Sequence, residues 1–251
     1  MSEVLAIPTT RDEAWRYADA AALAELTPAD LGNWHEATLT PGETRAKCLA
    51  LDDQWPGLHR VRLDVGEGAR AELFAVLSAS AYTRLEVEVV LAKDAHFEFG
   101  AVTIGGSDVT REIVTRVRHA APEASSIQVV RAVHWDRATG NFLGRVEVAR
   151  NAQKTDAAQD FKGLLIGKGA TINAKPELEI FADDVKCAHG AAIGALDERA
   201  AYYMASRGID PDAARKLLVR AFIADAFVAL GDEGERDTLL EAALAALGDA
   251  V

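Results

Sequence analysis

Short runs of alternating apolar and polar residues recur through the middle of the chain, and turn-like clusters separate them at a nearly constant interval. The alternating runs, which have the period of half-buried β-strands, lie at residues 59–65, 84–91, 97–99 and 146–148. The turn-like clusters lie at residues 66–68, 92–95, 120–124 and 149–152. Their spacing of roughly 26 to 28 residues is that of one coil of a parallel β-solenoid, in which each coil buries its apolar face only by stacking on the next.

An antiparallel sandwich or barrel of short strands explains the same pattern, and periodicity alone leaves the choice open. Composition favours the solenoid, because its narrow interior must be filled by small aliphatic side chains. Hydrophobic residues make up 49% of the chain, whereas aromatic residues make up only 6%.

Both ends of the chain have helical patterns. Thr10 and Glu13 have the spacing of a capping box, and the N-terminal stretch is expected to be helical until Thr27 and Pro28 interrupt it. Asp210 followed by Pro211 is a helix start signal. The C-terminal helices are expected over residues 196–206, 211–231 and 235–247. We therefore divide the chain into a helical and loop segment 1–57 that contains short strands, a solenoid core 58–195 and a helical segment 196–251.

The charge balance excludes several classes of function. The chain has 27 basic and 39 acidic residues, for a net charge of −12, which is unfavourable for binding nucleic acid. No apolar run approaches the roughly 20 residues of a membrane span, and the first residues lack the pattern of a signal peptide. We therefore expect a cytoplasmic protein.

The chain has two cysteines, Cys48 and Cys187, too few for a disulfide framework or a self-contained zinc finger. The segment from Gly163 to Gly169 resembles a phosphate-binding loop. The match to such a loop fails at two positions. Three rather than four residues separate the first two glycines, and a glycine rather than a serine or threonine follows Lys168. We interpret Gly167 and Gly169 as turns between strands. No dinucleotide-binding fingerprint is present, so the sequence does not indicate whether a flavin binds.

Cys187 and His189 are two residues apart in a strand-like segment, so both side chains project to one face, roughly 7 Å apart along the strand. A thiolate and an imidazole at this spacing suit zinc, iron or an iron–sulfur cluster. Two ligands do not close a four-coordinate site. The remaining ligands come either from Asp183 or Asp184 or from a partner chain. A purely structural role for Cys187 and His189 also stays open at this point.

The segment that carries this pair is long and unusual. Residues 172–194, with the sequence INAKPELEIFADDVKCAHGAAIG, resemble the hallmark segment of the SufB/SufD family of iron–sulfur cluster assembly proteins. Gly190 directly follows His189, and this His-Gly pair resembles the SufD branch of the family. The SufB branch has His-Glu at this position. The strong resemblance extends from about Asp160 to Phe227.

The resemblance implies a mainly β fold, with a right-handed parallel β-helix core between N- and C-terminal helical segments. It also implies a non-catalytic scaffold that pairs with SufB through the β-helix and docks the SufC ATPase through its C-terminal helices. ATP would bind to SufC only. A transient iron–sulfur cluster would form at the SufB–SufD junction, with His189 as a ligand and Cys187 beside it as a further ligand or sulfur relay.

Two other functions are compatible with a solenoid. One is a polysaccharide-active enzyme, which the scarcity of aromatic residues disfavours. The other is a structural β-helix protein that assembles with itself. Homodimerisation of the isolated scaffold is compatible with this fold, because an unpaired end of a β-helix exposes a sheet edge.

Overall fold

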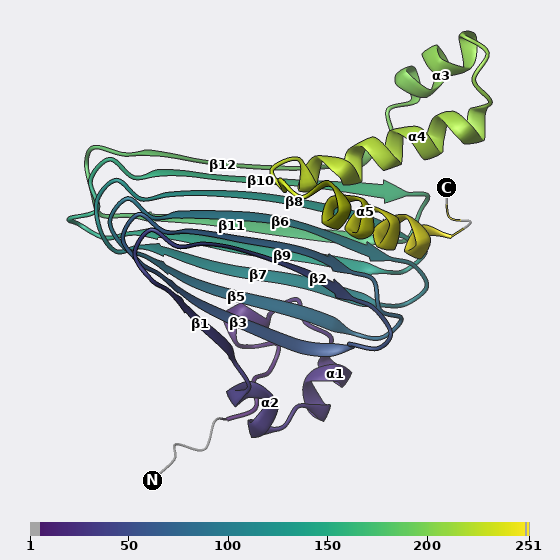
Figure 1. The fold of residues 1–251 in the computed structure, drawn as a ribbon. Coiled ribbons are helices and arrows are strands. Elements are labelled where there is room, and N and C mark those ends of the chain that lie inside the picture. The colour runs from purple at the N-terminus through teal and green to yellow at the C-terminus, as the bar shows by residue number, and fades with distance from the viewer. Residues whose placement is uncertain (1–5, 249, 251) are drawn as a thin grey trace.

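The computed structural model describes residues 6–248 and 250, and its centre is a stack of parallel strands (Figure 1). Odd-numbered strands form one six-stranded sheet, in the order β1-β3-β5-β7-β9-β11, and even-numbered strands form the other, in the order β12-β10-β8-β6-β4-β2. We call these the odd sheet and the even sheet. Every strand pair is parallel, and each coil contributes one strand to each sheet. The predicted parallel β-solenoid is confirmed, and the antiparallel alternative is wrong.

The strands of the odd sheet are β1 (His35–Leu39), β3 (Gly57–Val65), β5 (Thr83–Leu91), β7 (Thr110–His119), β9 (Thr139–Val148) and β11 (Thr171–Ile180). The strands of the even sheet are β2 (Thr44–Leu51), β4 (Arg70–Leu77), β6 (His96–Gly105), β8 (Ser125–Trp135), β10 (Asp156–Ile166) and β12 (Lys186–Ala195).

The length of a coil changes along the solenoid. The register partners Arg60 and Glu86, on β3 and β5, are 26 positions apart in the sequence. The register partners Asn141 and Asn173, on β9 and β11, are 32 positions apart. The spacing expected from the sequence therefore holds for the first coils only. β1 and β2, which lie in the segment expected to be loop with short strands, are members of the two sheets and extend the stack towards the N-terminus.

The interior of the solenoid is mainly aliphatic, with a few phenylalanines. Phe142 of β9 and Phe161 of β10 face each other across the interior with ring centroids 5.2 Å apart, and both are almost fully buried. Their neighbours in this core include Val87, Ile113 and Val130. The period of two in the sequence thus reflects side chains that alternate between this interior and the outer faces.

Between residue 6 and β1 the chain forms three short helices, η1 (Glu13–Trp15), α1 (Ala20–Glu25) and α2 (Pro28–Gly32). The expectation of one helix with a capping box at Thr10 and Glu13 is wrong, since the Glu13 carboxylate pairs with Lys175 of β11. The capping box forms instead between Thr27 and Asp30, with Pro28 in the first helical turn. Thr27-Pro28 therefore starts a helix, because proline is well suited to the first helical position.

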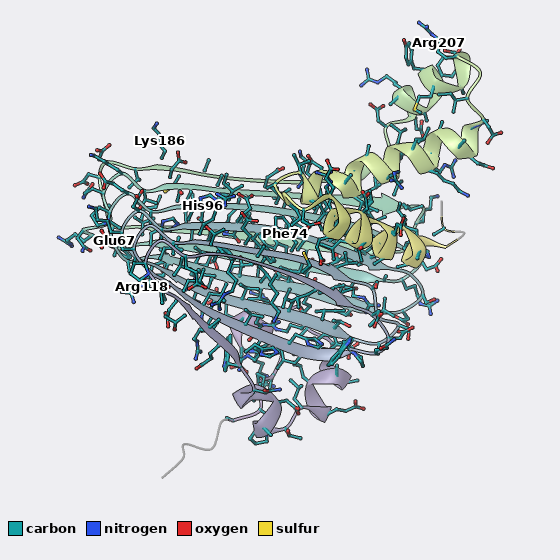
Figure 2. The ribbon with its side chains drawn as sticks, in the orientation of Figure 1. Glu67, Phe74, His96, Arg118, Lys186 and Arg207 are labelled. Atoms are coloured by element: carbon teal, nitrogen blue, oxygen red, sulfur yellow. The ribbon has the colours of Figure 1, made fainter. Side chains whose placement is uncertain are left out.

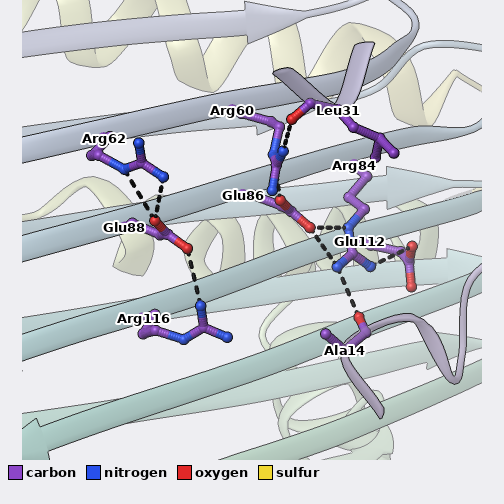
Figure 3. A network of polar contacts seen from close by, with 9 residues as sticks. All are labelled: Ala14, Leu31, Arg60, Arg62, Arg84, Glu86, Glu88, Glu112 and Arg116. Carbon is purple, nitrogen blue, oxygen red and sulfur yellow. Dashed lines mark hydrogen bonds and ion pairs between the residues drawn. The ribbon is translucent and has the colours of Figure 1, made fainter. Parts of the chain in front are cut away.

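Buried ion pairs hold this segment against the outer face of the odd sheet (Figure 3). Arg84 is fully buried, pairs with Glu86 of its own strand and Glu112 of β7, and donates to the carbonyl of Ala14. Arg60 pairs with Glu86 and donates to the carbonyl of Leu31 in the same way. The guanidinium groups therefore tie the helical segment to the strands.

The C-terminal segment comprises α3 (Glu198–Ser206), α4 (Pro211–Ala224), η2 (Asp225–Phe227) and α5 (Glu233–Leu247). Asp210 caps α4 and Pro211 is in its first turn, as the sequence predicts. The end of α4, together with η2 and α5, covers the outer face of the even sheet, where Phe227 and Ile223 pack against residues such as Phe74 (Figure 2). The α3–α4 hairpin projects away from the sheets, with Arg207 at its tip.

No helix among residues 6–248 is both long and apolar enough to cross a membrane. The expectation of no signal peptide concerns residues 1–5, which lie outside the described residues.

Candidate functional site

The last coil of the solenoid has an open end. β12 pairs with β10 along one edge, and no strand of the described residues pairs with its other edge (Figure 1). All of its residues except the half-buried Cys187 are exposed. An uncovered strand of this length offers a row of free backbone donors and acceptors, which can pair with a strand of another chain.

Cys187 and His189 lie near the start of this edge strand, just after Lys186, which Figure 2 labels. Their register partners on β10 are Ala157 and Gln159, and both partners are buried inside the solenoid. Cys187 and His189 therefore face the interior side of the last coil. This register agrees with the prediction that the Cys187 and His189 side chains project to the same face of their strand.

The two side chains differ in their surroundings. Cys187 packs against an apolar cluster that includes Val148 and Ala157, whereas His189 is exposed at the open end. Burial and the nearby Asp156 carboxylate raise the pKa of the Cys187 thiol. Cys187 is therefore a protonated thiol at neutral pH in the chain alone.

The described residues do not bring further ligands to this pair. Asp183 and Asp184 lie in the turn before β12, where the Asp184 backbone N–H donates to Gln153. No group of three or more histidine, cysteine, aspartate or glutamate side chains with metal-binding geometry occurs among residues 6–248. A four-coordinate site at His189 needs ligands from outside the described part of this chain.

Two other histidines are part of the packing. His119 and His134 are fully buried and bonded to Ser126 and Thr103, each at 2.9 Å. Burial lowers the pKa of His119 to about 4 and that of His134 to about 3, so both are neutral. Both histidines are therefore part of the packed interior and not of the candidate site.

A set of polar residues in the interior is not apparent from the motifs. Gln128 on β8 and Gln159 on β10 point into the core, where they are 1% and 2% exposed. An amide nitrogen of Gln128 and both polar atoms of Gln159 have no hydrogen-bond partner among the described residues. Leaving such a group unpaired costs about 1–3 kcal/mol. The signal in the sequence was a glutamine at an inward position in each of two neighbouring strands of the even sheet.

Gly167 and Gly169 lie in the turn between β10 and β11 and have φ angles of 81° and 108°. Only glycine adopts such angles at little cost. This confirms the predicted turn at Gly167 and Gly169, whereas residues 163–166 belong to β10.

A second candidate surface lies at the C-terminal helices. A cavity of about 480 Å³ opens between the end of β10, the linker after β12, α3 and α4, with Leu165, Tyr202 and Val219 in its lining. Tyr202 and Tyr203 on α3 are 78% and 58% exposed. Exposed aromatic side chains of this kind are enriched at protein interfaces.

Comparison with known proteins identifies the family of this chain. Residues 22–222 match the family described as "SUF system FeS cluster assembly, SufBD core domain". The chain belongs to the SufBD core family. This family is that of the Suf system of iron–sulfur cluster assembly.

The relatives point to the SufD branch. The chain is 39% identical to the iron–sulfur cluster assembly protein SufD of Escherichia coli over 126 residues, which is 50% of this chain and 30% of that protein. It is 51% identical over 81 residues to Protein ABCI7, chloroplastic, of Arabidopsis thaliana, which is 32% of this chain and 17% of that protein. It is 30% identical to SufD of Bacillus subtilis over 139 residues, 55% of this chain and 32% of that protein. The matches thus span a third or less of each of these relatives.

Proposed function

We propose that this SufBD-family chain is a non-catalytic scaffold component of a cytoplasmic Suf complex, which pairs with a SufB-type partner through the open end of its solenoid. The observation that carries the proposal is the uncovered strand β12, which has Cys187 and His189 on its inner side. A partner strand added to this edge continues the ladder of backbone hydrogen bonds and covers both side chains.

The nascent iron–sulfur cluster is the cargo of this junction. His189 supplies an imidazole nitrogen to it, and Cys187 supplies a second ligand or relays sulfur. The partner chain supplies the remaining ligands, which accounts for the absence of a third ligand among the described residues. Burial of His189 and Cys187 by the partner also excludes water from the cluster.

We further propose that the SufC ATPase docks on the α3–α4 hairpin. The outer part of this hairpin, α3 and the start of α4, projects away from the sheets, and Tyr202 and Tyr203 are exposed on it. Its attachment to the even sheet through Phe227 gives a mechanical link between a bound ATPase and the solenoid. ATP binds to SufC and not to this chain.

The test is His189→Ala in a complex reconstituted with SufB and SufC. We expect the complex to assemble normally by size-exclusion chromatography and to lose most of its visible cluster absorbance and bound iron. His35→Ala is the matched control. His35 is an exposed histidine on β1, the edge strand of the odd sheet at the other end of the solenoid from His189. Equal cluster content in His189→Ala and the wild type, with the complex intact, would refute the role of His189.

The size of the isolated chain tests the pairing edge. We expect homodimers when SufB is absent and their replacement by the heteromeric complex when SufB is added, because both use β12. A homo-oligomer that persists in excess SufB and binds no SufC would favour a self-assembling structural protein instead.

A further inference from the structure

A column of polar side chains runs through the solenoid interior and ends at His189. Gln128 of β8 is the register partner of Gln159 of β10, and Gln159 is the register partner of His189 of β12. Register partners in adjacent parallel strands point to the same side and lie about 4.8 Å apart. His189 is therefore the outermost member of a stacked column, and Gln159 is the next one inside.

The inner members of this column are held differently. The side-chain oxygen of Gln128 accepts a hydrogen bond of 2.6 Å from the Thr115 hydroxyl. Neither the oxygen nor the nitrogen of Gln159 has a partner among the described residues, although the side chain is only 2% exposed. Gln159 is thus a buried amide with both of its hydrogen-bonding groups free.

The opposite wall makes room for the Gln159 amide. A Cβ atom added to Gly144 of β9 would lie 2.8 Å from the amide nitrogen of Gln159. The stacked rings of Phe142 and Phe161 close the space beside it. These walls offer few polar groups, so the groups in the column that can donate to the Gln159 oxygen are the amide nitrogen of Gln128, which also lacks a partner among the described residues, and the ring of His189.

A histidine that ligates a metal uses the lone pair of one ring nitrogen, and the N–H of the other is usually held by a hydrogen-bond acceptor. That acceptor fixes the tautomer and the orientation of the ring. A neutral amide oxygen directly beneath the ring is suitable for this purpose. Buried amides are rarely left without a partner, which gives Gln159 a physical reason to take up this contact.

We propose that Gln159 is the positioning residue for His189. The side-chain oxygen of Gln159 accepts the N–H of one imidazole nitrogen, and the lone pair of the other nitrogen points out of the open end towards the partner chain. The ligand role of His189 rests on the proposed function, whereas the hydrogen bond is a property of this chain alone. Gln159 itself does not touch the cluster.

The first test measures the tautomer of His189 by NMR in the full chain labelled with ¹⁵N-histidine, with His189→Ala used to assign the signal. In the wild type one neutral tautomer dominates. In Gln159→Met, which keeps the volume and removes the acceptor, we expect the tautomer ratio to fall about fivefold, the factor that one net hydrogen bond of ordinary strength provides.

Two further variants separate positioning from packing. Gln159→Glu retains an acceptor oxygen at the same place and should restore the preference of the wild type. Gln128→Met removes an equally buried amide one coil deeper and should leave the His189 tautomer unchanged. An unchanged ratio in Gln159→Met, no recovery in Gln159→Glu, or an equal change in Gln128→Met would each overturn the proposal.

The second test uses the reconstituted complex. We expect Gln159→Met to release cluster iron to a chelator about tenfold faster than the wild type, in the range known for loss of a hydrogen bond to a ligating histidine. If His189→Ala abolishes the cluster and Gln159→Met changes neither the tautomer nor iron release, this inference fails and the proposed function stands. If His189→Ala leaves the cluster intact, the proposed function fails and Gln159 loses its role in assembly, even where the tautomer responds.

Discussion

Replacement of Gly100 by alanine tests how the C-terminal helices are seated on the even sheet. Gly100 lies on β6 beside Phe74, at the point where η2 meets the sheet. A Cβ atom at this position would lie 2.0 Å from the backbone oxygen of Ala226 and 2.6 Å from the Phe74 ring. Because η2 rests on the bare backbone of Gly100, one methyl group is enough to displace it.

The magnitude follows from these distances. An ordinary carbon–oxygen contact is about 3.3 Å, so the oxygen of Ala226 must move by about 1.3 Å. This oxygen belongs to the backbone and cannot rotate away, and Phe227, fully buried next to it, moves with it. Overpacking of this kind costs typically about 1–3 kcal/mol. In a chain of this size that lowers the melting temperature by about 2–12 °C.

The assay combines thermal unfolding with hydrogen exchange. We expect Gly100→Ala to melt at a lower temperature and to lose amide protection in α4, η2 and α5, while the strands away from this contact keep theirs. Gly194→Ala is the matched control, because Gly194 is also in a strand of the even sheet and an added Cβ meets nothing within 4 Å. It should be neutral or slightly stabilising.

A Gly100→Ala chain that melts with the wild type and keeps full protection over residues 219–230 would refute the reasoning. It would mean that the helices do not rest on the backbone of β6. Equal destabilisation by Gly194→Ala would also refute it, since the cost would then come from alanine in a strand and not from the contact.

Two further predictions concern the buried polar groups. His119 and His134 have folded-state pKa values of about 4 and about 3, below the ordinary 6.5, so their contribution to stability is complete above pH 6.5 and is lost as the pH falls towards 4. We expect urea unfolding to give a free energy of unfolding about 2 kcal/mol per histidine lower at pH 5 than at pH 7.5. His119→Gln should remove about half of this pH dependence. Equal stability at both pH values would contradict this. Trp15 is almost fully buried and its ring lies 3.6 Å from the Arg84 guanidinium, so Trp15→Ala should weaken docking of the N-terminal segment by about 3–5 kcal/mol and expose it to limited proteolysis. Tyr17→Ala, at a side chain that is 37% exposed, should leave the protease resistance of this segment unchanged. Equal cleavage of both variants would count against the docking contact.

Local signals predicted the parts of the fold that depend on neighbouring residues. Alternation with a period of two located β3, β5 and β9, because each strand must place one set of side chains inside. Asp210 and Pro211 located the start of α4, because capping depends on a few adjacent residues. The same kind of signal failed at Thr10 and Glu13, where a charge partner on β11 competed for the glutamate.

Contacts between distant residues were not predictable in this way. Arg84 and Arg60 hold the N-terminal helices through carbonyl groups far away in the chain. The coils become longer along the solenoid, so no fixed offset identifies the register of the later ones. Without that register, the positions of the buried ion pairs and glutamines cannot be assigned.

The sequence by itself determined the period of the first coils and the pair Cys187 and His189 on one face of a strand, because both follow from local patterns. Only the tertiary structure decided that this strand is an uncovered edge and that Gln159 lies directly beneath His189. The physical reason is that Gln159 and His189 belong to successive coils and become neighbours only when the last two coils stack in register. Stacking also separates a half-buried thiol from an exposed imidazole, a difference in solvation that no spacing in the sequence contains.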